Sequence, residues 1–138
     1  MSFKLAGLVP LLQVFDMPTS VRFYCDRLGF EIVNSSPTVH GRQGDYFHWA
    51  MLRREGIALM LNTAYDEGDR PREPDSSRSA AHRDTALFFS CPEVDEAYRE
   101  LQQTGITIAE GPVITRYSMK QFTVVDPDGY HVCFQWPV

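Results

Sequence analysis

Hydrophobic and polar residues near the start of the chain change from a strand pattern to a helical one. The apolar, β-favouring run Leu8–Phe15 ends at Asp16, and Pro18 follows in a position suited to the first turn of a helix. Apolar residues then recur every three or four positions across residues 17–28. Gly29 stands where a left-handed helix end favours glycine. These patterns predict a strand, then a helix that Asp16 caps.

Three further strand patterns complete the first half of the chain. Residues 30–32 alternate in polarity, and Tyr46–Leu52 forms a longer β-favouring run after a loop rich in Ser, Pro and Gly. Arg53–Gly56 is typical of a hairpin turn, and Ile57–Leu61 follows as the next strand. The first half therefore predicts the order strand, helix and three strands.

The same order returns after a polar stretch. Asp66–Asp84 is rich in Pro, Ser, Arg and acidic residues, and its composition predicts a mobile connector. Thr85–Cys91 then has a strand pattern, and Val94–Leu101 carries one apolar helical face that ends before Gly105. Glu93 takes the place that Asp16 has in the first half, as a second helix cap.

The last residues predict three more strands. One includes Ile106 and Ile108, and Met119–Val125 and Tyr130–Trp136 form a hairpin closed by Asp126–Gly129, whose glycine suits the positive φ of such a turn. The chain therefore duplicates a βαβββ unit. Neither half alone could bury both faces of its sheet, so we expect the halves to share a core or a cavity.

Composition narrows the class of protein. The 138 residues suffice for one domain, and 43% hydrophobic with 22% charged residues is typical of soluble globular proteins. A net charge of -5 offers no basic patch for nucleic acid.

Gln13 and Asp16 interrupt the N-terminal apolar run below spanning length, and no cleavage site follows, so we expect a cytoplasmic protein without membrane contact. Three cysteines without CxxC spacing argue against a disulfide framework and a structural zinc site.

Several motifs together resemble one known superfamily. They are Asp16, Ser20, Phe23 and Tyr24 at their spacing, then Leu28-Gly29-Phe30, and near the end Asp126-Pro127-Asp128-Gly129. This pattern resembles the vicinal-oxygen-chelate superfamily, which includes glyoxalase I, extradiol dioxygenases, fosfomycin-resistance enzymes and bleomycin-resistance proteins. The resemblance implies an α+β fold of two βαβββ modules in tandem that form a concave, partly open, β-barrel-like sheet. We expect a single domain, with module one at about 5–63, a connector at 64–83 and module two at 84–138.

The resemblance also implies where a metal would bind. In metal-dependent members one ligand comes from the first strand and one from the last strand of each module, which correspond here to Val9, Met60, Ala86 and Cys133. Hard or borderline divalent ions prefer imidazole and carboxylate ligands, which this set lacks. We therefore expect no metal site and no cofactor.

Histidines are the remaining candidates for chemistry. His40 and His82 lie in polar loops, where we expect them to be exposed. His48 and His131 lie in predicted strands, and His131 shares a sheet face with Cys133, so it is the one weak candidate for a catalytic base. A single inward histidine without carboxylate partners does not make a metal site.

Residues two apart in a strand share a face, so the four positions that correspond to metal ligands also indicate their neighbours on that face. Together these residues predict a binding surface with an apolar centre and a polar rim. The predicted ligand-binding residues are Gln13, Trp49, Met60, Asn62, Phe88, Ser90, Tyr117, His131, Cys133 and Gln135. The leading hypothesis is a metal-independent small-molecule-binding protein similar to the bleomycin-resistance group, a homodimer that sequesters a drug or metabolite. A small organic ligand with cationic or aromatic character suits the acidic balance and the aromatic side chains.

Two alternatives stay open at this point. One is a metal-dependent lyase, dioxygenase or isomerase that uses non-standard ligands, or an enzyme that uses His131 as a base. The other is a scaffold whose cavity is filled by its own side chains and which acts only through its dimer surface.

Overall fold

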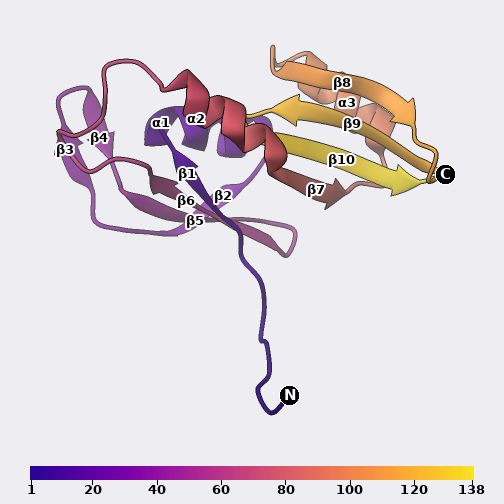
Figure 1. Ribbon diagram of the computed structural model, residues 1–138, viewed down its shortest axis with the longest axis horizontal. Coiled ribbons are helices and arrows are strands. Elements are labelled where there is room, and N and C mark those ends of the chain that lie inside the picture. The colour runs from indigo at the N-terminus through magenta and orange to yellow at the C-terminus, as the bar shows by residue number, and fades with distance from the viewer. The chain divides into compact units, whose positions relative to one another are not determined.

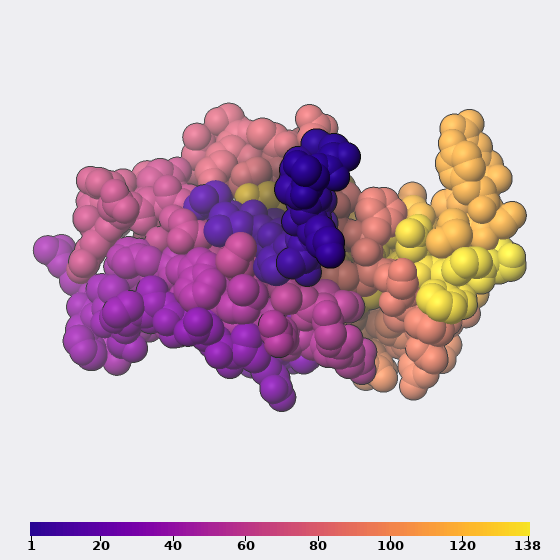
Figure 2. Space-filling view, turned by 90° about the horizontal axis from the view of Figure 1, so that it is seen from below, coloured from indigo at the N-terminus to yellow at the C-terminus, as the bar shows by residue number.

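The computed structural model describes residues 1–138, and the chain divides into two compact units, Met1–Arg70 and Pro71–Val138. Residues 1–10 contain no helix or strand, and Phe3, Leu5 and Leu8 within them are exposed. Figure 2 shows this segment in indigo on the surface turned to the viewer. No helix in the structure is both long and apolar enough to cross a membrane.

Unit 1 contains one four-stranded sheet, a small hairpin and a helical segment (Figure 1). Its elements are β1 (Leu11–Val14), α1 (Met17–Val21), the π-helical η1 (Arg22–Arg27), β2 (Glu31–Ser35), β3 (Val39–Gly41), β4 (Gly44–Tyr46), β5 (Trp49–Arg54) and β6 (Ile57–Thr63). The strand order is β1-β6-β5-β2, with β1 parallel to β6 and the other neighbours antiparallel. The hairpin β3–β4 is separate from this sheet.

Unit 2 repeats this arrangement after an added helix. Its elements are α2 (Ser76–Ala81), the 3₁₀-helical η2 (His82–Asp84), β7 (Ala86–Ser90), α3 (Val94–Gln102), β8 (Thr107–Ile114), β9 (Met119–Val125) and β10 (His131–Pro137). The strand order is β7-β10-β9-β8, again with the first and last strands of the unit parallel. The expected α+β class with two βαβββ modules is confirmed.

The first helix begins and ends at the predicted residues. The Asp16 carboxylate accepts a hydrogen bond from the Thr19 amide at 3.1 Å, which makes Asp16 the N-cap. The helix continues as a π-helix, in which the Leu28 amide donates to the Phe23 carbonyl five residues earlier. Gly29, at φ +75°, ends it in the left-handed region. The spacing of apolar residues did not predict the π-helical turns.

The helix of unit 2 matches its counterpart in extent but not in its cap. α3 occupies the residues that the apolar periodicity predicts, and Gly105 follows at φ +74°. Glu93, however, makes no side-chain capping bond. The expectation of a capping side chain is therefore confirmed for Asp16 and wrong for Glu93.

The predicted strand Tyr46–Leu52 is divided in the structure. β4 ends at Tyr46 and β5 begins at Trp49. Between them the backbone amides of His48 and Trp49 donate to the Ser36 hydroxyl at 3.0 and 3.1 Å. A side-chain acceptor from an earlier loop thus takes hydrogen bonds that a continuous strand would give to a neighbouring strand.

The predicted mobile connector contains an ordered helix instead. Asp75 caps α2, because its carboxylate accepts from the Ser77 amide at 2.9 Å. The Arg78 guanidinium lies 2.8 Å from the Asp128 carboxylate, and the ring of His82 stacks on Tyr130 with centroids 3.9 Å apart. The helix therefore packs against the β9–β10 turn, which polarity patterns within the connector could not show.

These contacts also correct the expectation for one histidine. His82 is half-buried, and its Nδ1 lies 2.6 Å from the Asp128 carbonyl oxygen. His40 is exposed as expected and pairs with Asp45 at 2.8 Å. His40 lies in strand β3 and His82 in the 3₁₀-helical η2, so neither is in the loop that its polar surroundings predicted. Polar composition alone did not distinguish an exposed hairpin from a packed helical segment.

Candidate functional site

In unit 1, one face of the sheet is buried under α1 and η1, and the other carries the predicted binding residues. The buried face is lined by Leu12, Val14, Leu59 and Leu61. Alternate residues point the opposite way. This opposite surface, called here the open face of unit 1, consists of Leu11, Gln13, Trp49, Met51, Met60 and Asn62.

Strand register arranges the open face of unit 1 in two rows. Leu11, Met60 and Met51 lie opposite one another on neighbouring strands and form an apolar row. Gln13, Asn62 and Trp49 form the adjoining row, in which the Asn62 amide donates to the Gln13 side-chain oxygen at 3.2 Å. The face thus combines flexible thioether and aliphatic groups with amides and one indole, a make-up common in small-molecule sites.

In unit 2, the corresponding surface carries five of the remaining predicted residues. The open face of unit 2 consists of Phe88, Ser90, Gln121, Thr123, His131, Cys133 and Gln135. Phe88 lies opposite Cys133, and Ser90 lies opposite Gln135. Phe88 is 56% exposed, which is high for an aromatic side chain in the middle of a strand. It therefore provides a ring face that a ligand can stack on.

The thiol of Cys133 is buried in this face. Burial raises its pKa above the ordinary value, and the negative charge of Glu110 acts in the same direction against a hydrogen bond with Thr123. The group is therefore a neutral thiol at physiological pH. Since the thiolate is the nucleophile and the metal ligand, Cys133 is poorly suited to either role.

His131 lies on the same face and is half-exposed. It is opposite Ala86 on one side and Val125 on the other. None of the hydrogen bonds or ion pairs in the structure involves its ring, so no carboxylate orients it as a general base. A catalytic role for His131 stays a prediction without structural support.

One predicted residue lies apart from both open faces, and others were missed. Tyr117 is in the turn between β8 and β9, is 71% exposed, and accepts a hydrogen bond from Arg116. The sequence reasoning missed Met51, Gln121 and Thr123. Each of them is an even number of residues from another open-face residue in β5 or β9, or lies opposite one on the neighbouring strand. This two-residue alternation would have identified them if the pairing register had been known.

The four positions that correspond to metal ligands in the superfamily carry no suitable donor set. Val9 and Ala86 have only hydrocarbon side chains, Met60 offers a thioether, and Cys133 a neutral thiol. No group of three or more His, Cys, Asp or Glu side chains lies close enough to hold a metal ion. The residues present do not fit the divalent ion of the metal-dependent members.

A cleft lies elsewhere in unit 1. It has a volume of about 480 Å³ and is lined by the junction of β1 and α1, the β3–β4 hairpin and the segment that follows β6. None of the ten predicted ligand-binding residues lines it. Its walls come from three separate parts of the chain, which strand or helix periodicity does not relate to one another.

Two βαβββ units of identical strand order define this chain as a duplicated-module protein of the vicinal-oxygen-chelate type. The family model described as Glyoxalase/Bleomycin resistance protein/Dioxygenase superfamily matches residues 7–134. The chain belongs to this superfamily.

Known relatives match over nearly the whole chain. The bleomycin resistance protein of Geobacillus stearothermophilus is 31% identical over 132 residues, which cover 91% of this chain and 92% of the relative. The crystal structure of TnmS3, an antibiotic binding protein from Streptomyces sp. CB03234, superimposes with a TM-score of 0.66 at 25% identity and covers 98% of this chain and 100% of that chain. TioX from Micromonospora sp. ML1 reaches a TM-score of 0.68 at 18% identity, covers 94% of each chain and shows the fold alone.

Proposed function

We propose that this protein binds and sequesters a small organic molecule, a drug or a metabolite, without a metal ion. The observation that carries the proposal is the composition of the open faces. At the positions where metal-dependent members have ligands, this chain has Val9, Met60, Ala86 and Cys133. The open faces that carry Met60 and Cys133 also carry the exposed amide of Gln13 and the exposed ring of Phe88. A relative named for bleomycin resistance and a solved neighbour named as antibiotic binding support the same class of ligand.

The proposal extends to the character of the ligand and to the setting. The exposed ring of Phe88 and the half-buried ring of Trp49 suit an aromatic or cationic group, since stacking on one such ring contributes about 0.5–1.5 kcal/mol beyond area burial. The net charge of -5 favours a cation. The setting proposed is a cytoplasmic homodimer.

The first test combines metal analysis with a binding titration. Protein purified without chelator is analysed for metal by plasma mass spectrometry and then titrated with metal-free bleomycin, with and without EDTA, by calorimetry. We expect no stoichiometric metal and the same Kd in both titrations. Stoichiometric metal, or binding that EDTA abolishes, would overturn metal independence and favour the metal-dependent enzyme.

A second test locates the binding surface. Phe88→Ala removes an exposed ring and should weaken bleomycin binding about tenfold, which corresponds to about 1.4 kcal/mol. Ile114→Ala is the matched control, because Ile114 is 66% exposed in the same sheet but lies opposite Lys120, on the face that does not include Phe88. Equal effects of the two substitutions on Kd would contradict a ligand on the open face.

A further inference from the structure

The cleft of unit 1 contains a preformed environment for a cation. Its walls include the rings of Phe15, Tyr46 and Tyr65 and the carboxylate of Asp16. Phe15 and Tyr65 meet edge to face with centroids 6.1 Å apart. Gly41 lets the ring of Tyr46 approach closely, since a Cβ there would lie 2.9 Å from that ring. Aromatic rings beside a carboxylate are the groups that recognise organic cations.

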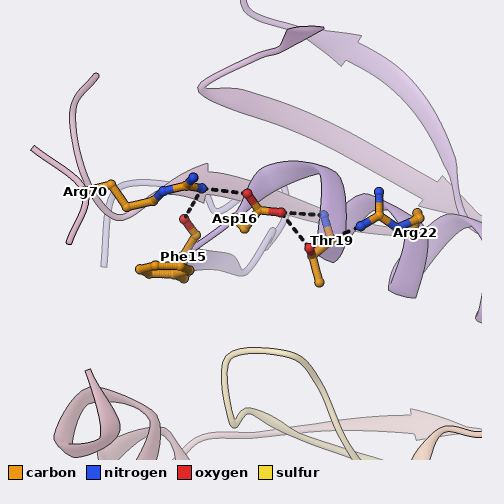
Figure 3. A network of polar contacts seen from close by, with 5 residues as sticks. All are labelled: Phe15, Asp16, Thr19, Arg22 and Arg70. Carbon is orange, nitrogen blue, oxygen red and sulfur yellow. Dashed lines mark hydrogen bonds and ion pairs between the residues drawn. The ribbon is translucent and has the colours of Figure 1, made fainter. Parts of the chain in front are cut away.

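A side chain of the protein already occupies part of this environment (Figure 3). One guanidinium nitrogen of Arg70 lies 2.6 Å from the Asp16 carboxylate and 3.5 Å from the Phe15 carbonyl oxygen. The guanidinium carbon lies over the Phe15 ring, 5.1 Å from its centroid. A planar cation is thus held by an anion, a carbonyl dipole and an aromatic face at once.

The Asp16 carboxylate is fixed before any cation arrives. Its second oxygen accepts from the amide and the hydroxyl of Thr19, and Arg22 donates in turn to that hydroxyl (Figure 3). Burial would raise the pKa of Asp16, but the bonds from Thr19 and Arg70 outweigh it and hold the pKa below its ordinary value. The group is therefore a carboxylate near neutral pH, with one oxygen directed toward the cation.

Arg70 is held much less firmly than Asp16. It lies in a segment after β6 that contains no helix or strand, and its side chain is 37% exposed. Ion pairs of this exposure contribute little to stability, so a change in the position of Arg70 has a small cost. A ligand that replaces the guanidinium and also fills the remaining cleft would gain apolar contacts that Arg70 does not make.

We propose that the cleft of unit 1 is a second ligand site, which binds a small planar cation, an amidinium or guanidinium group attached to an aromatic ring, in competition with Arg70. The site is separate from the open faces and does not depend on the function proposed for them.

The test uses the full chain and two ligands of the same shape. Benzamidine carries a planar cation on an aromatic ring, and benzamide is its neutral counterpart. Both are titrated into ¹⁵N-labelled protein. We expect benzamidine to shift amide signals around Phe15, Tyr46 and Tyr65, and benzamide to bind at least tenfold more weakly. Equal affinities, or shifts confined to the open faces, would overturn the proposal.

Competition is tested by removing the internal cation. Arg70→Ala should bind benzamidine about three- to fivefold more tightly than the unchanged protein, because the ligand no longer displaces an ion pair. Arg72→Ala is the control, since Arg72 is exposed in the same segment and forms no ion pair in the structure. Unchanged affinity in Arg70→Ala, or an equal gain of affinity in Arg72→Ala, would contradict competition between benzamidine and Arg70.

The anion is tested by a substitution that preserves the helix cap. Asp16→Asn keeps an oxygen for the Thr19 amide but loses the charge, and it should weaken benzamidine binding at least tenfold. Phe15→Leu tests the ring without touching the cap and should weaken binding severalfold. Full affinity in both variants would refute the site. Ile114→Ala, outside the cleft and both open faces, should leave benzamidine binding unchanged.

Discussion

At the scale of single residues, two glycines at equivalent hairpins face different demands. Gly56 lies in the β5–β6 turn of unit 1 and Gly129 in the corresponding β9–β10 turn of unit 2, at φ +81° and +88°. A Cβ at Gly56 would meet no atom within 4 Å, whereas one at Gly129 would lie 2.4 Å from the carbonyl oxygen of Ser79 in α2. Both positions favour glycine for its backbone freedom, but only Gly129 is also required by close approach.

This difference predicts unequal costs of alanine. Gly56→Ala should destabilise the protein by about 1 kcal/mol, the strain of a left-handed alanine. Gly129→Ala should cost about 3 kcal/mol, because α2 must also move away from the turn. Urea unfolding of the two variants measures both values. Similar losses would contradict the close packing of α2 on this turn.

A second prediction at this scale concerns acid. Because the pKa of Asp16 is held below its ordinary value, the stability that Asp16 contributes is present above the ordinary carboxyl pKa, about 4, and is lost as pH falls through the lower folded-state pKa. The advantage of the unchanged protein over Asp16→Asn should therefore shrink as pH falls from 6 to 3. Thermal unfolding across this range measures it, and a constant difference would contradict the prediction.

At the scale of elements, α2 shows how tertiary contacts stabilise a helix that local sequence does not predict. Its six residues are too few for a stable isolated helix. The β9–β10 turn supplies the missing contacts, because the carboxylate of Asp126 accepts from the amides of Asp128 and Tyr130 and so shapes the loop that α2 packs on. The Asp128 side chain, 2% exposed, then meets Arg78.

Removal of this buried contact should be costly. Arg78→Ala leaves the Asp128 carboxylate buried without its guanidinium partner and should destabilise the protein by about 3 kcal/mol. Arg83→Ala, at an exposed position in η2, should change stability by less than about 0.5 kcal/mol. Hydrogen exchange should rise across residues 76–84 in the first variant alone. Equal exchange in both would show that α2 is not held by this pair.

The elements also show how far the sequence predicts the fold. Gly29, Gly56, Gly105 and Gly129 all have positive φ at the predicted helix ends and turns, because a local backbone requirement leaves a local sequence signal. The break between Tyr46 and Trp49 and the helix α2 were not predictable, since each depends on a partner distant in sequence, Ser36 or Asp128.

The candidate sites were likewise predictable where residues of a strand determine them, and not where residues distant in sequence meet. The ligand positions that the family resemblance implies, extended along each strand by parity, correctly placed Gln13 beside Asn62 and Phe88 beside Cys133. The cleft was missed, because Phe15, Tyr46 and Arg70 come from three separate parts of the chain, and periodicity does not relate these parts to one another. Parity groups residues within a sheet and says nothing of the loops around it.

At the scale of the whole molecule, the two units share one strand order but stabilise their last hairpins differently. In unit 1, Arg54 at the β5–β6 turn donates to the Leu28 carbonyl at the end of the π-helix, at 2.7 Å. In unit 2, the β9–β10 turn is covered by α2 through Asp128. A duplicated topology thus leaves each copy free to acquire its own local contacts.

The uncovered turn at Glu55 and Gly56 has a practical consequence. Both residues are exposed and the space beside Gly56 is open, so added chain there can extend into solvent without displacing a neighbouring element. The β5–β6 turn is therefore the position at which this protein should tolerate an inserted epitope or a fluorescent reporter. The same insertion in the β9–β10 turn before Tyr130 should destabilise the fold, because α2 covers that turn.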